Sequence, residues 1–405
     1  MGGMDAVTHR PSNGARAAFA GLIAACLMTA PPEAHAMPIQ WRGLLDLVAA
    51  ERTAAYSFNR LTPGDNSLDA YRLRLFANAQ VNDHLQVLAQ VLLDDNSGLF
   101  VDGAYAIYTP APARDLHLEV GKIPWAVGTY APRTHSDKNP LIGTPLMYSY
   151  HTSMIWYQIV PTADAMLNAA GTGSTGVDYF GYAVGMGMPI VDDSYWDVGA
   201  TLIGSARPFE FTLGMTNGTP GWGSTTRDDN SGKSVLGRVG LAPVPALRFG
   251  VSGSYGPYLV AALDPRLPAG HTANDYHQKL AMADLELLVG QAELRAEGVT
   301  NVWETPLIGD LRATAGYAEL KYSVAAGLYA AGRWDVEQFS RLTPSSGMAR
   351  PWDWNVTRLE AGFGYRFTRE ARAKLVYQRS RFENATSGGG DRVVSALAAQ
   401  LSFGF

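Results

Sequence analysis

Two glycine-rich segments come closest to motifs that bind nucleotide phosphates. Residues 171–176 match G-x-G-x-x-G, but they follow a proline-broken stretch and precede VDYF, where a nucleotide fold needs a helix. Residues 230–234 (NSGKS) end like a P-loop, but Arg227 stands where the first glycine is required. Both segments are therefore interpreted as polar loops without a nucleotide.

Histidines offer the next opportunity for chemistry. His135 and His151 share one long predicted loop, and loop histidines in pairs are more often solvated than metal-bound. His151 with Ser153 or Asp164 could form a hydrolytic set, but nothing in the spacing demands it. The sequence contains neither G-x-S-x-G nor H-E-x-x-H. We therefore predict no enzyme, no catalytic residue, no metal and no cofactor.

Charged residues at alternate strand positions are a stronger indication of function. The predicted pore-lining residues are Arg72, Arg74, Arg358, Arg366, Arg372 and Lys374 on a basic wall, and Asp284, Glu286, Glu293 and Glu297 on an acidic one. The basic residues lie near the junction of the last and first strands. Facing arcs of opposite charge set selectivity in pores. The alternative is that these charges pair with each other and only solvate the interior.

Strands must position these charges, and the final stretch, residues 391–405, has the clearest pattern. Val393, Leu397, Leu401, Phe403 and Phe405 lie on one face, and polar residues such as those at 400 and 402 lie on the other. Period 2 means a strand with two chemically different faces. A membrane barrel places one face against lipid and the other against water, whereas the alternative is an edge strand of a soluble sandwich.

The whole chain contains sixteen candidate strands, each close to the roughly 9–11 residues of a tilted membrane strand. Alternation is clear in 71–81, 247–255 and 357–367, and weakest in 40–49 and in 311–322, where the phase slips around Glu319. Outward aromatics near strand ends are predicted to form interfacial girdles. They are Tyr71, Trp334, Tyr365, Phe367, Tyr377, Phe403 and Phe405.

The connections between these strands alternate in length. Tight ones at 206–208 and 290–291 alternate with long ones at 126–195 and 256–276. A barrel with both ends in the periplasm needs an even strand count, short turns at one rim and long loops at the other. We therefore predict an all-β fold, a transmembrane antiparallel up-and-down barrel of about 16 strands. The low charged fraction of 17% fits an apolar exterior.

A sixteen-strand barrel is wide enough for an aqueous channel. Residues 126–195 lack clear periodicity, and part of this stretch is predicted to fold inward and form the constriction of the channel. The charged constriction residues would be Arg133, Asp137, Lys138 and Asp164. The alternative is an external cap or a helix-bearing surface loop.

The first 36 residues have the pattern of a secretory signal. Arg10 and Arg16 precede an apolar stretch at 17–30, and Ala34-His35-Ala36 forms a small-x-small cleavage site. We predict cleavage before Met37 and a barrel domain over 37–405. Cys26, the only cysteine, resembles a lipoprotein signal, but the apolar stretch continues past it. After cleavage no disulfide or thiolate site remains.

Four stretches resemble bacterial outer-membrane porins, and more loosely the phosphate-selective porin group. They are YRLRLFANAQV (71–81), DGAYAIYTP (102–110), LHLEVGKIPW (116–125) and LSFGF (401–405). The loops contain no run of arginine and lysine like that expected of a phosphate-selective pore. The resemblance implies a homotrimer in the outer membrane, in contact with lipid and lipopolysaccharide.

These observations together predict an outer-membrane porin of a diderm bacterium, which passes ions and small hydrophilic solutes by passive diffusion. The net charge of −5 gives no case for nucleic acid as a partner. One alternative is a barrel sheath around an envelope partner such as an electron-transfer protein. A barrel enzyme is the other alternative.

Overall fold

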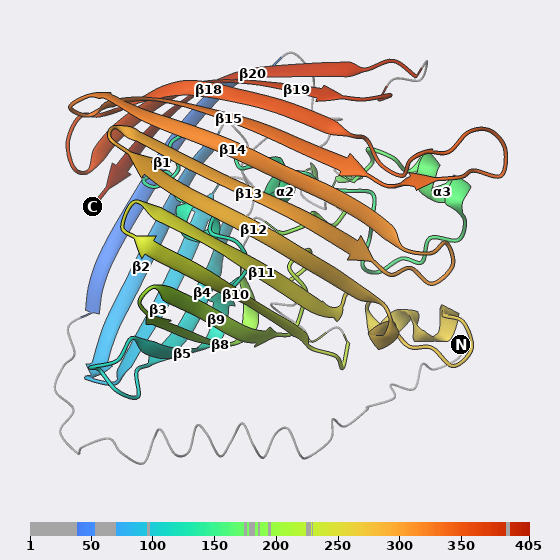
Figure 1. Cartoon of the computed structure of the whole chain (residues 1–405), viewed down its shortest axis with the longest axis horizontal. Coiled ribbons are helices and arrows are strands. Elements are labelled where there is room, and N and C mark those ends of the chain that lie inside the picture. The colour runs from blue at the N-terminus through green and yellow to red at the C-terminus, as the bar shows by residue number, and fades with distance from the viewer. Residues whose placement is uncertain are drawn as a thin grey trace, which may run out of the picture. The chain divides into compact units, whose positions relative to one another are not determined.

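Alternating apolar and polar residues form sixteen strands that close into one antiparallel barrel (Figure 1). The structure is a computed structural model that describes residues 39–52, 70–94, 98–173, 176–177, 183–184, 187–192, 196–223, 228, 230–385 and 389–405. The predicted signal peptide and residues 174–175 of the glycine-rich segment lie outside the described residues. The fold predicted from the sequence is confirmed.

Each barrel strand pairs with its neighbours in sequence, and the last pairs with the first. The barrel strands are β1 (Ile39–Arg52), β2 (Ala70–Asn82), β3 (Leu85–Asp94), β4 (Gly98–Tyr108), β5 (Leu116–Pro124), β8 (Trp196–Ala206), β9 (Phe209–Thr216), β10 (Ser234–Val244), β11 (Leu247–Pro257), β12 (His277–Val289), β13 (Ala292–Trp303), β14 (Leu311–Ala325), β15 (Leu328–Phe339), β18 (Val356–Arg366), β19 (Ala371–Phe382) and β20 (Arg392–Gly404). At the junction of β1 and β20, Leu47 pairs with Leu401.

The outward face of the barrel is apolar, as a surface in contact with lipid must be. Leu359, Phe363 and Leu397 are about half exposed, whereas their inward neighbours Arg358 and Glu360 are fully buried. The predicted girdle residues are all exposed on this face: Tyr71, Trp334, Tyr365, Phe367, Tyr377, Phe403 and Phe405. The lipid-facing phase read from the sequence is therefore confirmed for these strands.

Two strands that gave weak patterns are regular in the structure. β1 runs three residues beyond the predicted end at position 49. In β14 the phase does not slip: Leu311, Ala313, Ala315, Tyr317 and Glu319 all face inward and are buried. The predicted slip was wrong because apolar side chains were assigned to lipid, while in β14 they face the interior of the barrel.

Short turns join the strands at one rim of the barrel and long loops at the other (Figure 1). Short elements belong to the loops: η1 (Ala131–Arg133), α2 (Leu146–Ser149), α3 (Ala163–Asn168), β6 (Gly176–Val177), β7 (Ala183–Val184), η2 (Ala261–Arg266), η3 (Ala273–Asp275), β16 (Arg341–Leu342) and β17 (Arg350–Pro351). Among the described residues, no helix has the length and apolar character needed to cross a membrane.

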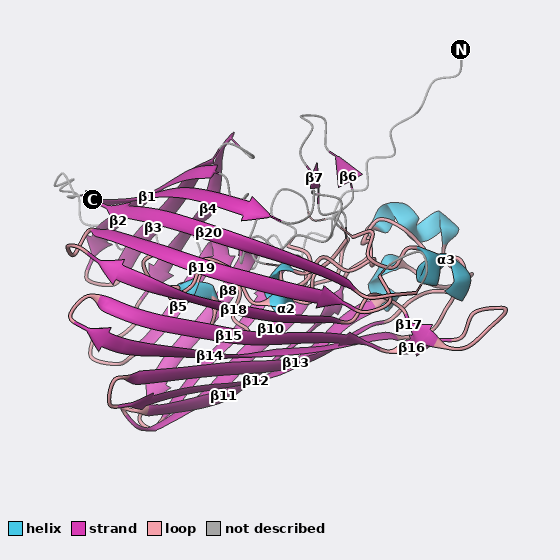
Figure 2. Ribbon diagram, turned by 90° about the horizontal axis from the view of Figure 1, so that it is seen from above, coloured by secondary structure: helices cyan, strands magenta, loops and turns pink. Residues whose placement is uncertain are grey.

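The connection between β5 and β8, which we call the long loop (residues 125–195), enters the barrel. Its helix α2 lies among the strands, whereas α3 lies beyond the rim with the other loops (Figure 2). Backbone groups of the loop bond to inward side chains of β15, β18 and β19. Part of the loop therefore folds into the lumen, as the sequence predicted.

Candidate functional site: a loop-narrowed lumen

An apolar core joins the long loop to the inner wall of one side of the barrel. Tyr130, Leu146 and Tyr148 of the loop are buried in one cluster with inward residues of β13 and β14, such as Val299 and Tyr317. The rings of Tyr130 and Tyr148 are stacked with centroids 5.2 Å apart. Burial raises the pKa of Tyr130 to about 12. This side of the lumen is packed protein.

Charged side chains of the same wall bond to the backbone of the loop. Glu360 accepts a 2.7 Å bond from the amide of Gly143, and Arg333 donates a 2.7 Å bond to the carbonyl of Gly143. Arg358 donates to the carbonyl of Thr144, and the carboxylate of Asp335 accepts from the amide of Leu146 at 3.0 Å. A buried charge is tolerated only when it is paired and hydrogen-bonded, so the loop and the wall satisfy each other.

Two further contacts fix the start of the long loop. The carboxylate of Glu297 accepts bonds from the amide and hydroxyl of Thr129 and from the hydroxyl of Tyr148. Arg133 forms an ion pair with Glu319 on β14. The loop therefore contacts the wall at sites on β13, β14, β15 and β18.

Basic side chains of β19 bond to the next part of the loop. Lys374 donates to the carbonyls of Ser136 and Leu141, at 2.8 and 3.1 Å. Arg372 donates to the carbonyl of Asp137 at 2.6 Å, and the carboxylate of Asp137 accepts from Arg42 of β1 at 2.7 Å. Arg372 and Lys374 point inward and hold the loop; their predicted role in lining the pore stays a prediction.

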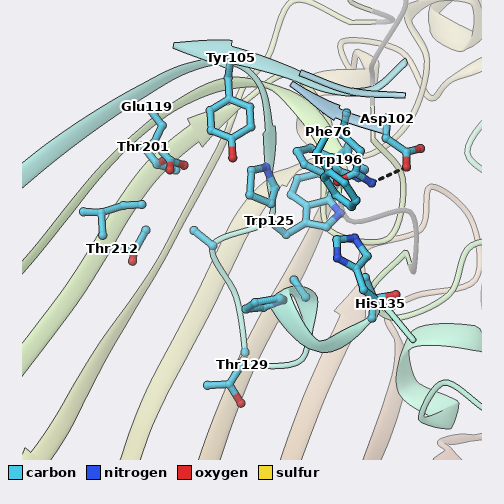
Figure 3. A pocket seen from close by; sticks show the side chains of 18 of the residues that line it. Phe76, Asp102, Tyr105, Glu119, Trp125, Thr129, His135, Trp196, Thr201 and Thr212 are labelled. Atoms are coloured by element: carbon cyan, nitrogen blue, oxygen red, sulfur yellow. Dashed lines mark hydrogen bonds between the residues drawn. The ribbon is translucent and has the colours of Figure 1, made fainter. Parts of the chain in front are cut away.

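A cavity of about 520 Å³ lies on the other side of the loop, against the wall formed by β2–β5 and β8–β10. Figure 3 shows its lining: Trp125 and Tyr105 lie between Glu119 on one side and Phe76 and Trp196 on the other. The loop contributes eight residues between Trp125 and His135 to this lining: Trp125, Ala126, Gly128, Thr129, Ala131, Pro132, Thr134 and His135. The lumen thus contains packed protein on one side of the loop and a cavity on the other.

A β-bulge shapes the wall of the cavity. Gln90 pairs with Gly103 and Val91 with Val101, so Asp102 is the extra residue. A bulge turns two consecutive residues to the same face, and both Asp102 and Gly103 are buried inside the barrel. A Cβ atom at Gly103 would overlap the ring of Trp196, so the glycine permits this ring to lie against β4.

His135 of the long loop lies at the edge of the cavity. Its imidazole is a titratable group that faces the cavity. Its ring meets Phe76 edge-on, with centroids 5.3 Å apart. Burial, together with the cations Arg74, Arg42, Arg72 and Lys138, holds the pKa of His135 well below its ordinary value. His135 is therefore neutral at pH 7.

The ten predicted pore-lining residues occupy four kinds of position. Arg74 lines the cavity, and Arg72 precedes it in the same buried inner face of β2. Arg358, Arg372, Lys374 and Glu297 contact the loop. Asp284 pairs with Arg238, Glu286 and Glu293 pair with Arg295, and Arg366 is exposed at the end of β18. Their effect on selectivity stays a prediction.

Of the predicted constriction residues, three lie in the inserted part of the loop. Arg133 and Asp137 are bonded to the wall, and Lys138 is exposed. Asp164 is on α3 beyond the rim, where its carboxylate accepts a bond from the amide of Ser345. The described residues contain no group of three or more His, Cys, Asp or Glu side chains placed to hold a metal.

Apart from Arg74, sequence reasoning missed the residues that form the cavity. Glu119 and Trp125 lie in the quoted segment 116–125, and their inward phase was the available signal. Trp196 and Arg238 come from β8 and β10, and nothing in the sequence places them opposite residues 124–135.

Comparisons with known proteins give the fold. No family model and no curated protein matches the sequence. The anion-selective porin from Comamonas acidovorans superposes with a TM-score of 0.57 at 9% identity, over 91% of this chain and 99% of that one. OmpF of Salmonella typhi in complex with daunomycin superposes with a TM-score of 0.55 at 12% identity, over 91% of this chain and 98% of that one. OmpT, an outer membrane protein of Vibrio cholerae (trimer form), superposes with a TM-score of 0.51 at 12% identity, over 92% of this chain and 100% of that one. The chain therefore has the fold of these outer-membrane barrels.

Proposed function

We propose that the protein is an outer-membrane porin through which ions and small hydrophilic solutes diffuse. The observation that carries this proposal is the division of the lumen: the long loop packs against one side and leaves a cavity lined by charged, hydroxyl and aromatic side chains. A lumen of this kind limits solute size while keeping a wet path. The cavity is the narrow part of that path.

Conductance in a planar bilayer tests the proposal. Purified, refolded protein should insert and give steady open channels in potassium chloride. A folded protein that stays silent would contradict conduction and favour a sheath or an enzyme. Folding is checked separately, by the mobility difference between heated and unheated samples on a gel.

Two tryptophan variants locate the path. Trp196→Ala should raise the single-channel conductance, because it removes a ring that lines the cavity. Trp334→Ala is the matched control, because Trp334 lies on the lipid-facing side of β15 and is 52% exposed. Equal conductance in both variants would place the path elsewhere.

The proposal extends to export and assembly. Residues 1–36 would be removed on export, residues 37–405 would form the barrel in contact with lipid and lipopolysaccharide, and three copies would associate. Amino-terminal sequencing of protein from the outer-membrane fraction tests the cleavage. Light scattering in detergent tests the trimer, and a monomeric mass would contradict it.

A further inference from the structure

Aromatic rings dominate the apolar lining of the cavity. Phe76, Phe100, Tyr105, Trp125 and Trp196 all contribute to it. The rings of Tyr105 and Trp196 are 6.1 Å apart and tilted by 43°, so they present faces and edges to the same space. Aromatic side chains pack well against a flat ring and attract a cation to their faces. A solute with a flat ring therefore fits this lining better than one with a saturated body.

Every charged side chain of the cavity lining except one has an oppositely charged partner. Arg74 lies 3.9 Å from Asp46 and 3.8 Å from Asp102. Arg238 bonds to both Asp284 and Glu210.

Glu119 is the exception. Its carboxylate accepts a 3.3 Å bond from the hydroxyl of Thr201, and among the described residues no cation lies within ion-pair distance of it. The balance of charge in the cavity is therefore negative at Glu119, next to the ring of Tyr105 (Figure 3).

We propose that the cavity preferentially binds small organic cations that carry an aromatic ring, with the ring among Tyr105, Trp125 and Trp196 and the cationic group at Glu119. This inference rests on the proposed function, since the same cavity is the narrow part of the path. A passing aromatic amine gains a charge partner and ring contacts in one place. An organic anion finds no such partner, because both arginines of the lining already have carboxylates beside them.

Three probes of similar size separate charge from ring. Phenethylammonium has both features, 2-cyclohexylethylammonium has the charge without the aromatic ring, and phenylacetate has the ring with the opposite charge. Added to open channels in a planar bilayer, phenethylammonium should interrupt the current at the lowest concentration. Cyclohexylethylammonium should need about threefold more, because it keeps the cation but loses the aromatic–aromatic contact with the protein rings. Phenylacetate should be the weakest.

Variants of the lining tie the effect to named residues. Glu119→Gln should raise the half-blocking concentration of phenethylammonium about fivefold, the value of a partly exposed ion pair. Tyr105→Leu should reduce the advantage of phenethylammonium over cyclohexylethylammonium. Glu370→Gln is the matched control, because Glu370 is exposed in the turn between β18 and β19, and it should leave the block unchanged.

The failure of this inference differs from the failure of the proposed function. The inference would be overturned if all three probes blocked the open channels equally. It would also be overturned if phenethylammonium blocked the Glu119→Gln variant as well as the parent. Either result would leave the proposed porin function intact. Folded protein that gave no channel current would contradict the proposed porin function. Binding would then be measured by tryptophan fluorescence of the refolded protein, because Trp125 and Trp196 line the cavity. No change with phenethylammonium would overturn the inference as well.

Discussion

Arg333 and Glu360 form an ion pair across β15 and β18, with 2.7 Å between Nη2 and a carboxylate oxygen, and neither side chain is exposed. One glycine of the long loop, Gly143, donates its amide to Glu360, and its carbonyl accepts from Arg333. The pair therefore binds both polar groups of a single residue. This contact is the chemical basis for a loop that stays inside the barrel.

Removal of one partner should destabilise the folded protein. Arg333→Met leaves Glu360 buried without its counter-charge, and such losses cost about 3–5 kcal/mol. The free energy of unfolding, measured with urea in detergent micelles, should fall accordingly. Arg369→Met, in the exposed turn between β18 and β19, should change it by less than about 0.5 kcal/mol. A double variant, Arg333→Met with Glu360→Gln, should lose less than the sum of the two single losses.

A methyl group at Gly143 should displace the loop. The Cβ atom of Gly143→Ala would overlap the carboxylate of Glu360, so either the loop backbone or this carboxylate must move and the contact between them is disturbed. Single-channel recordings should show a changed mean conductance and more current noise. Gly298→Ala is the control, because nothing lies within 4 Å of an added Cβ there. Identical recordings for both variants would show that this contact does not position the loop.

Acid should weaken the protein through His135. Its folded-state pKa is depressed, so below about pH 6.5 the unfolded chain binds the proton that the folded chain refuses. The stabilising contribution is complete above that pH and is lost as the pH falls towards the folded pKa, by up to about 1.4 kcal/mol per unit. His135→Asn should flatten this dependence in urea titrations from pH 4.5 to 8. Parallel curves for the variant and the parent would refute the assignment.

Neutralising the arginines of β2 should change ion selectivity. Arg72 and Arg74 face the interior, and Arg74 lines the cavity, so Gln at both positions removes positive charge from the path. The reversal potential in a salt gradient should move towards cations. Arg369→Gln, in the exposed turn, should leave it where it was. An unchanged reversal potential in the double variant would remove both arginines from the selectivity mechanism.

The sequence predicted the barrel well because lipid imposes one rule on every outward position. Leu359, Phe363 and Leu397 obey it, and their alternation alone gives strand type and facing. The interior has no such rule. Inward residues of β14 are apolar where the loop covers them and charged at Glu319, so the pattern seemed to slip there.

The site was predicted only in part, because its contacts join residues far apart in the chain. The inward phase of Arg358, Lys374 and Glu297 could be read from the sequence, but not that each bonds to the long loop. The bulge at Asp102 depends on the pairing of β3 with β4. Such pairings follow from tertiary packing, which a periodic pattern does not contain.

The two sides of the lumen differ in what a substitution there disturbs. Side chains on β13–β15, β18 and β19 contact the long loop, whereas those on β2–β5 and β8–β10 line the cavity. Substitutions at distant sites change the free energy of unfolding almost additively. A change in the cavity lining should therefore leave the effect of the loop contacts on the free energy of unfolding as it was. Substitutions in the cavity lining can therefore change which solutes fit, while the contacts that hold the long loop stay the same.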